Sequence, residues 1–194
     1  IFPLLRQDRM AEADLPLLLS PAGDAALEEM AQRAAAITAH RFGKTIALYA
    51  PLYLSNECVN NCVYCGFAVR NQIERRTLTV AEALAEAEVL YREGFRHVLL
   101  VSGEAPRAFS LDDLEAVVKK LVGRFASIAI EVFPMDLEGY RRLERAGVDN
   151  LTLYQETYDR ALYATLHRGP KADFDKRLAA IEAGNMDLIV GTQA

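Results

Sequence analysis

Short apolar segments alternate with longer amphipathic ones from residue 45 onward, and this alternation restricts the fold more than any other feature of the chain. The apolar segments have the length of buried strands, and the segments between them repeat their apolar positions with the period of an α-helix. The pattern predicts an α/β protein built from consecutive βα units around a parallel sheet. The predicted strands are residues 45–54, 97–104, 127–134, 150–157 and 187–192, and the predicted helices are residues 77–94, 110–124, 136–147, 158–167 and 172–184.

Capping residues mark where two of these helices begin. Thr79 is followed three positions later by Glu82, which is the pattern of a capping box. Ser110 precedes the next helical segment and is predicted to cap it. Gly94 is predicted to end the first of the two helices.

The first 44 residues form a predicted N-terminal helical segment, and residues 45–194 form a second domain. Between Ala25 and Arg41, apolar or small residues recur with a helical period. Asp24 is predicted to cap this helix, and Gly43 is predicted to end it because glycine adopts the backbone conformation found after helices.

Two architectures suit consecutive βα units, a (β/α) barrel and an open doubly wound sheet. Both place ligands at the carboxyl ends of the strands, and polar residues follow several of the predicted strands. A complete eight-unit barrel takes about 200–250 residues or more. We therefore predict a partial (β/α) TIM-type barrel of about five βα units, either shortened or part of a longer protein.

The composition excludes several classes of protein. Hydrophobic residues make up 52% and charged residues 25% of the chain, which is typical of a globular protein. The formal net charge of −5 argues against nucleic acid as a partner. No apolar run is long enough to span a membrane, and residues 1–10 lack the pattern of a signal peptide, so we predict a cytoplasmic protein without membrane contact.

All three cysteines, Cys58, Cys62 and Cys65, lie within eight positions in the order C-x3-C-x2-C. An odd number of adjacent thiols is a poor basis for disulfides and agrees with a reducing compartment. A structural zinc site needs four ligands. One of the scattered histidines could complete such a site, so zinc remains an alternative.

A [4Fe–4S] cluster explains the three thiols better. Such clusters are normally held by four thiolates. With three, one iron keeps an open position for another ligand, which allows chemistry at the cluster. The cysteine segment also follows a predicted strand, where a loop can surround a cluster at the end of a sheet.

The sequence CVNNCVYC resembles the C-x3-C-x-aromatic-C signature of the radical S-adenosylmethionine (SAM) superfamily. The resemblance implies that Cys58, Cys62 and Cys65 ligate the cluster and that its open iron binds the amino and carboxylate groups of SAM. Reduction then cleaves SAM to a 5′-deoxyadenosyl radical, which removes a hydrogen atom from the substrate. Tyr64 is expected beside the cluster.

Further residues fit the same family. Ser102, Gly103 and Glu104 resemble its GGE element, with serine in place of the first glycine, and imply a contact with the ammonium group of SAM. Glu131 ends the next strand and resembles the acid that contacts the ribose hydroxyls. Gln155 is predicted to contact the cofactor or the substrate.

The segments LYAPLYLSNECVNNCVYCGF and YQETYDRALYATLHRGPKADFDKRL resemble the tyrosine-cleaving branch of this superfamily, over about residues 15–178. This implies cleavage of L-tyrosine at Cα–Cβ to 2-iminoacetate (dehydroglycine) and p-cresol for thiamine thiazole biosynthesis. The implied partners are an electron donor such as flavodoxin or ferredoxin and the thiazole synthase.

Three alternatives stay open. The first is the related tyrosine lyase of hydrogenase maturation, which leads to CO and cyanide, and the second is a radical SAM reaction on another amino acid. The third is an inactive or truncated metal-binding fragment. Residues 179–194, AAIEAGNMDLIVGTQA, do not resemble the expected continuation of the family, which a truncation, a chimaera or a misjoined segment would explain.

Overall fold

The computed structural model describes residues 1–7, 9–184 and 189–191, and it divides into two compact units, Ile1–Ala47 and Leu48–Ala194. Within the described residues, none of the helices has the length and apolar character needed to cross a bilayer. The first unit is entirely helical, with α1 (Phe2–Leu5), a 3-10 helix η1 (Glu12–Asp14), α2 (Leu15–Leu18), α3 (Pro21–Asp24) and α4 (Leu27–Phe42).

The cap predicted for the long N-terminal helix is wrong. Asp24 ends α3, and α4 begins at Leu27 after Ala26, which has no capping side chain. The predicted end is confirmed, because Gly43 has a φ of 65° and follows the last helical residue.

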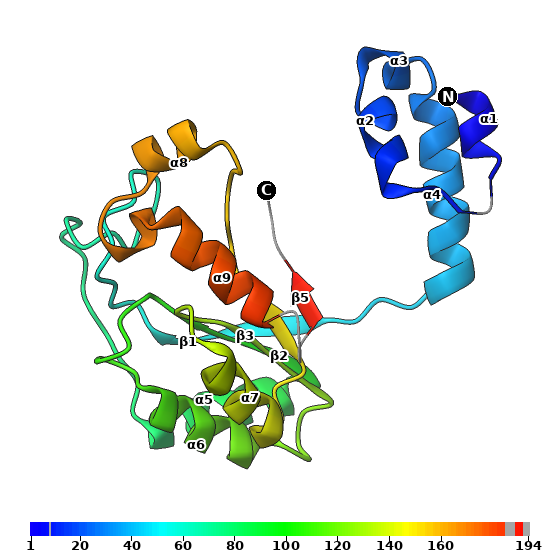
Figure 1. The fold of residues 1–194 in the computed structure, drawn as a ribbon. Coiled ribbons are helices and arrows are strands. Elements are labelled where there is room, and N and C mark those ends of the chain that lie inside the picture. The colour runs from blue at the N-terminus through cyan, green and yellow to red at the C-terminus, as the bar shows by residue number, and fades with distance from the viewer. Residues whose placement is uncertain (8, 185–188, 192–194) are drawn as a thin grey trace. The chain divides into compact units, whose positions relative to one another are not determined.

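The second unit is an all-parallel sheet with helices between its strands (Figure 1). Its strand order, β1-β2-β3-β4-β5, follows the sequence without the reversal that defines a doubly wound sheet. This confirms the partial (β/α) barrel. The strands are β1 (Tyr49–Ser55), β2 (His97–Ser102), β3 (Ser127–Glu131), β4 (Asn150–Thr152) and β5 (Ile189–Gly191), and the helices are α5 (Val80–Arg92), α6 (Leu111–Leu121), α7 (Leu137–Ala146), α8 (Arg160–Leu166), η2 (Pro170–Ala172) and α9 (Phe174–Gly184).

Alternate residues of the strands form the hydrophobic core with the helices. In β1, Leu52 and Leu54 are buried, whereas Tyr49 and Tyr53 are exposed on the opposite face. The core continues through Leu100, Ile130 and Leu151 of the next strands, and α5, α6, α7 and α9 contribute further side chains. Burying one face on helices leaves the other face, and the carboxyl ends of the strands, to form the site.

The capping box predicted at Thr79 is present, and the predicted cap Ser110 also forms one. The Thr79 hydroxyl accepts from the backbone N–H of Glu82, and the Glu82 carboxylate accepts from the backbone N–H of Thr79. Ser110 and Asp113 make the same pair of bonds at the start of α6.

Several strands are shorter than predicted because the chain leaves the sheet to form the site. The segment 150–157 is a strand only over 150–152, and the segment 127–134 only over 127–131. The first strand covers 49–55 in place of 45–54, since Ile46 and Leu48 are exposed. The last predicted strand, 187–192, is described only at 189–191, where β5 pairs with β4, and its remaining residues lie outside the described part of the chain.

We expect Ser110→Ala to lower the free energy of unfolding by about 1 kcal/mol, because the cap of α6 is lost. The Ser110 hydroxyl and backbone N–H hold the pKa of Asp113 below its ordinary value. The pair therefore contributes stability above the ordinary carboxyl pKa and loses it as the pH falls through the lowered pKa. Urea unfolding of both proteins from pH 7 down to pH 3 tests this, and a difference that stays constant over that range would contradict the assignment.

Candidate functional site

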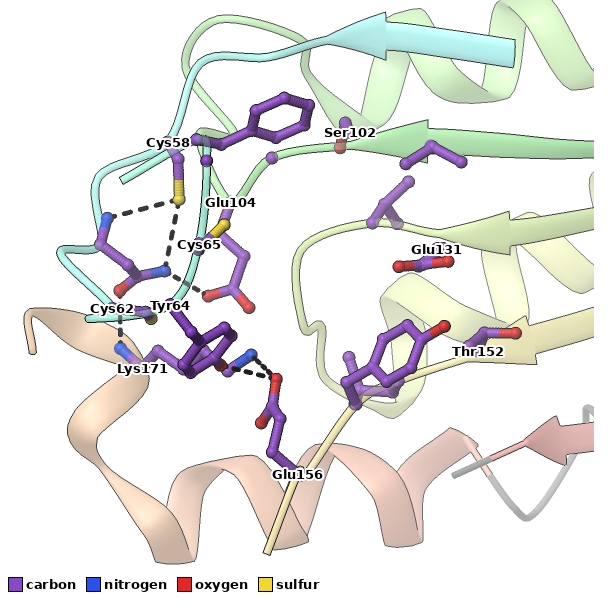
Figure 2. Close-up of a pocket in the computed structure, with 18 of the residues that line it drawn as sticks. Cys58, Cys62, Tyr64, Cys65, Ser102, Glu104, Glu131, Thr152, Glu156 and Lys171 are labelled. Carbon is purple, nitrogen blue, oxygen red and sulfur yellow. Dashed lines mark hydrogen bonds and ion pairs between the residues drawn. The ribbon is translucent and has the colours of Figure 1, made fainter. Parts of the chain in front are cut away.

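The carboxyl ends of β1 to β4 open into a cavity of about 460 Å³ (Figure 2). The loop after β1, the ends of β2 and β3, the segment after β4 and residues from η2 and α9 line it. All of the predicted site residues except Gln155 are among these lining residues.

The cysteines lie on the loop between β1 and α5, which contains no helix or strand. Cys58, Cys62 and Cys65 are unpaired and line the cavity. Burial raises the pKa of the Cys62 thiol, and the nearby Lys171 ammonium opposes this shift.

The side chain of Arg75 stabilises the conformation of this loop through hydrogen bonds to its backbone. Its guanidinium donates to the carbonyl oxygens of Asn56 (2.7 Å), Phe67 (2.9 Å) and Ala68 (2.9 Å). These carbonyls have no partner in a sheet or helix, so one planar side chain with five donors replaces the missing backbone pairing. No spacing rule in the sequence singles out Arg75 for this role.

Ser102 ends β2, Gly103 and Glu104 follow it, and all three line the cavity. Figure 2 shows Ser102 and Glu104 there. A Cβ on Gly103 would lie 2.2 Å from the Glu57 carbonyl oxygen and 3.2 Å from the Cβ of Cys58, so only glycine fits this approach. The Glu104 carboxylate forms a buried ion pair with Arg177 of α9. The Ser102 hydroxyl oxygen is buried and has no hydrogen-bond partner among the described residues.

The two remaining predictions differ in their placement. Glu131 lines the cavity from the end of β3, and burial raises the pKa of its carboxyl. Gln155 is completely buried outside the cavity lining, and its side-chain amide has no partner among the described residues, so its contact with a ligand stays a prediction. Thr152, Leu153, Tyr154 and Glu156 line the cavity, and continuing the strand period from Thr152 past β4 would have selected Glu156.

Glu156 is the one non-glycine residue with a positive φ, 61°, among those described. Its Oε1 accepts from the Tyr64 hydroxyl at 2.8 Å and from the Lys171 ammonium at 2.6 Å. A bulky residue held in this conformation is a sign of a functional constraint. Glu156 therefore ties the residue between two cysteines to the segment before α9 (Figure 2).

His167 completes this group of side chains. Its Nδ1 lies 2.9 Å from the Tyr163 carbonyl oxygen, which only accepts, so Nδ1 carries the hydrogen. Burial lowers the pKa of His167, which favours the neutral ring. The Tyr64 hydroxyl lies 2.7 Å from His167 Nε2 and 2.8 Å from Glu156 Oε1, and its single hydrogen serves one of these two atoms at a time. Burial and Glu156 raise the pKa of Tyr64, which keeps the phenol protonated.

A family model describes most of this chain. The model of the radical SAM superfamily matches residues 52–186, which include every residue that lines the cavity. The chain belongs to the radical SAM superfamily.

The similar proteins include a 2-iminoacetate synthase, a FeFe-hydrogenase maturase and a methylornithine synthase. The chain is 42% identical over 175 residues to 2-iminoacetate synthase of Salmonella typhimurium, a match that covers 90% of this chain and 46% of the relative. It resembles the FeFe-hydrogenase maturase HydG from Carboxydothermus hydrogenoformans with a TM-score of 0.76 and 35% identity, over 83% of this chain and 39% of that one. For methylornithine synthase (PylB) the TM-score is 0.78 and the identity 29%, over 98% and 57% of the two chains. The chain thus spans about half the length of the curated relatives it matches.

Radical SAM enzymes use a [4Fe–4S] cluster and SAM, and the donor groups of this cavity fit both. Among the described residues, no three Cys, His, Asp or Glu side chains converge closely enough to hold one metal ion. A four-iron cluster takes one thiolate per iron, so its ligands surround it and need not converge. The three thiols around one cavity therefore suit a cluster better than the alternative zinc site.

The close approach of Gly103 to the cysteine loop is testable. We expect Gly103→Ala to lower the free energy of unfolding by about 2 kcal/mol, because the new Cβ overlaps the Glu57 carbonyl. Gly66→Ala is the matched control, since its Cβ would meet nothing within 4 Å and neither glycine has a positive φ. Urea unfolding followed by circular dichroism measures both, and equal losses would show that the approach at Gly103 is not restrictive.

The buried ion pair gives a second test. We expect Arg177→Leu to cost about 3 kcal/mol of unfolding free energy, because Glu104 would remain as a buried charge without its partner. Arg160→Leu breaks an exposed arginine–aspartate pair with Asp175 and should cost less than about 1 kcal/mol. If the two variants unfold at the same urea concentration, the Glu104–Arg177 pair contributes no more to stability than the exposed Arg160–Asp175 pair does.

Proposed function

We propose that this chain takes part in radical cleavage of L-tyrosine at the Cα–Cβ bond, giving 2-iminoacetate and p-cresol for thiamine thiazole biosynthesis. The observation that carries the proposal is the 42% identity to 2-iminoacetate synthase over 175 of the 194 residues. The cavity at the strand ends, with its three unpaired thiols, supports it independently.

The proposal assigns a role to each predicted site residue. Cys58, Cys62 and Cys65 hold the [4Fe–4S] cluster. When bound, the cluster and SAM supply the one-electron bond cleavage that starts the reaction. The cofactor-binding residues proposed for SAM are Tyr64, Ser102, Gly103, Glu104, Glu131 and Gln155, of which Gln155 needs a change of its buried position to reach a ligand.

The charges of the cavity suit zwitterionic ligands. Glu104, Glu131 and Glu156 supply carboxylates that accept from an ammonium group, and Lys171 and Arg177 supply cations for a carboxylate. Both the methionine part of SAM and a free amino acid carry this pair of opposite charges.

Aromatic side chains line the same cavity. Tyr53 and Phe67 contact each other edge to face with ring centroids 6.1 Å apart, and Tyr154 faces the cavity from the segment after β4. Such rings pack against a flat group and help to exclude water from it. An adenine or a phenol ring meets this requirement.

The partners follow from the same proposal. A flavodoxin or ferredoxin would deliver the electron, and thiazole synthase would consume the unstable 2-iminoacetate. A cytoplasmic location, which agrees with the three unpaired thiols, belongs to this proposal.

A hydrogenase-maturation tyrosine lyase is the second candidate, favoured by the 35% identity to HydG. Both candidates share the tyrosine cleavage and differ in the fate of the glycine-derived product. Adding purified thiazole synthase with its sulfur donor and sugar substrate distinguishes them, because only the thiazole route would yield thiazole phosphate.

The deciding experiment is anaerobic purification, reconstitution with iron and sulfide, and electron paramagnetic resonance (EPR) of the reduced protein. We expect a [4Fe–4S]⁺ signal that changes when SAM is added, and p-cresol formation that depends on tyrosine, reductant and SAM. Cys58→Ala should lose the signal and p-cresol together, because one of three thiolates is removed.

Each contrary result has a defined meaning. A protein that binds zinc and no iron would refute the cluster assignment. A cluster whose EPR signal is unchanged by SAM would refute the cofactor site, and p-cresol formation by Cys58→Ala would refute the role of this thiol. SAM cleavage stimulated by another amino acid, with none from tyrosine, would replace tyrosine as the substrate.

A further inference from the structure

Asn60 lies between the first two cysteines and is only 2% exposed. Asparagine is mostly found at protein surfaces, so a buried one needs hydrogen-bond partners. The Asn60 side chain has three, from three separate parts of the chain. Its Nδ2 donates to Glu104 Oε2 at 2.8 Å and to Cys58 Sγ at 3.7 Å, and its Oδ1 accepts from the Lys171 backbone N–H at 2.8 Å.

These partners fix the orientation of the amide. The backbone N–H of Lys171 only donates, so it must face Oδ1 of Asn60. The opposite end of the amide is then the NH₂ group, which has one hydrogen for the Glu104 carboxylate and one for the Cys58 sulfur. A flipped amide would leave two acceptors facing each other at Glu104.

The surrounding backbone keeps Asn60 in this place. Gly169 has a φ of 86°, and a Cβ there would lie 3.2 Å from the Asn60 Cα and 3.3 Å from its Oδ1. The Asn61 N–H donates to the Arg168 carbonyl at 2.9 Å, and the Val59 N–H donates to the Glu104 carbonyl at 3.1 Å. Asn60 is thus held between two segments that are distant in sequence.

The Cys58 sulfur receives a second donor from the same residue, the backbone N–H of Asn60, at 3.4 Å. Hydrogen bonds to a ligating sulfur stabilise the more negative, reduced state of an iron–sulfur cluster and raise its reduction potential. Each hydrogen-bond donor affects the reduction potential more strongly in a buried environment than in water.

We propose that Asn60 is a positioning residue that raises the reduction potential of the [4Fe–4S] cluster through its side-chain hydrogen bond to the Cys58 sulfur. This inference rests on the proposed cluster at the three cysteines, and it concerns the potential at which the cluster accepts an electron. It does not depend on which amino acid is the substrate.

Two variants distinguish the hydrogen bond from Asn60 to the Cys58 sulfur from the structural contact of Asn60 with Lys171. Asn60→Leu fills a similar volume and keeps water out, but it removes the donor to Cys58 and the acceptor for Lys171. Asn60→Asp keeps an acceptor for the Lys171 N–H and puts a negative oxygen where the NH₂ group lies. Asn61→Ala is the matched control, because the Asn61 side chain contacts Arg70 at 3.3 Å and not a cysteine.

The measurement is a redox titration of the reconstituted proteins, followed by the EPR signal of the reduced cluster. We expect Asn60→Leu to shift the midpoint potential to a more negative value and Asn60→Asp to shift it further, with Asn61→Ala unchanged from the wild type. Iron and sulfide per chain, measured in parallel, report cluster content separately from potential.

The outcomes distinguish this inference from the proposed function. A wild-type protein without a cluster would refute the proposed function. A wild-type cluster with the same potential in both Asn60 variants would overturn this inference alone. Loss of the cluster in both Asn60 variants, with retention in Asn61→Ala, would also overturn it by making Asn60 a residue of cluster assembly.

Discussion

A loop that belongs to no helix or strand must still satisfy its backbone N–H and C=O groups, and the candidate site depends on how this chain meets that requirement. The cysteine loop does so with partners from elsewhere. Arg75 binds four of its carbonyls, the Val63 N–H donates to the Leu166 carbonyl at 3.0 Å, and the Asn61 N–H donates to the carbonyl of Arg168. The three thiols are therefore placed by contacts that also fix the segment leading to α9. The placement of the three thiols and the folding of this region therefore depend on the same hydrogen bonds.

The fold could be predicted well from the sequence because the apolar periodicity and the capping residues act locally. Thr79 with Glu82 and Ser110 with Asp113 close the same bonds that their spacing implies. Strand ends were predicted less well. After Thr152 the sequence continues with Leu153 and Tyr154, which also suit a strand, but β4 ends at Thr152, and composition alone does not show where the pairing stops.

The site could be predicted only in part. The cysteines and the Ser102–Glu104 segment are contiguous motifs, and the structure places both at one cavity. Lys171 and Arg177 are more than 60 residues from either motif and reach the cavity because the segment after α8 folds back over it. Such contacts depend on tertiary structure, so the spacing of residues in the sequence does not predict them. Asn60 lies inside the motif, yet its role depends on Glu104 and Lys171, which the motif does not contain.

Glu156 has a consequence for engineering this chain. Its left-handed backbone suits glycine better than any residue with a side chain, so replacement by glycine would relieve about 1 kcal/mol of conformational cost. The same replacement would remove the carboxylate shared by Tyr64 and Lys171. The backbone gain and the loss of these two bonds oppose each other, so the strain at this position cannot be relieved by glycine without giving up the carboxylate.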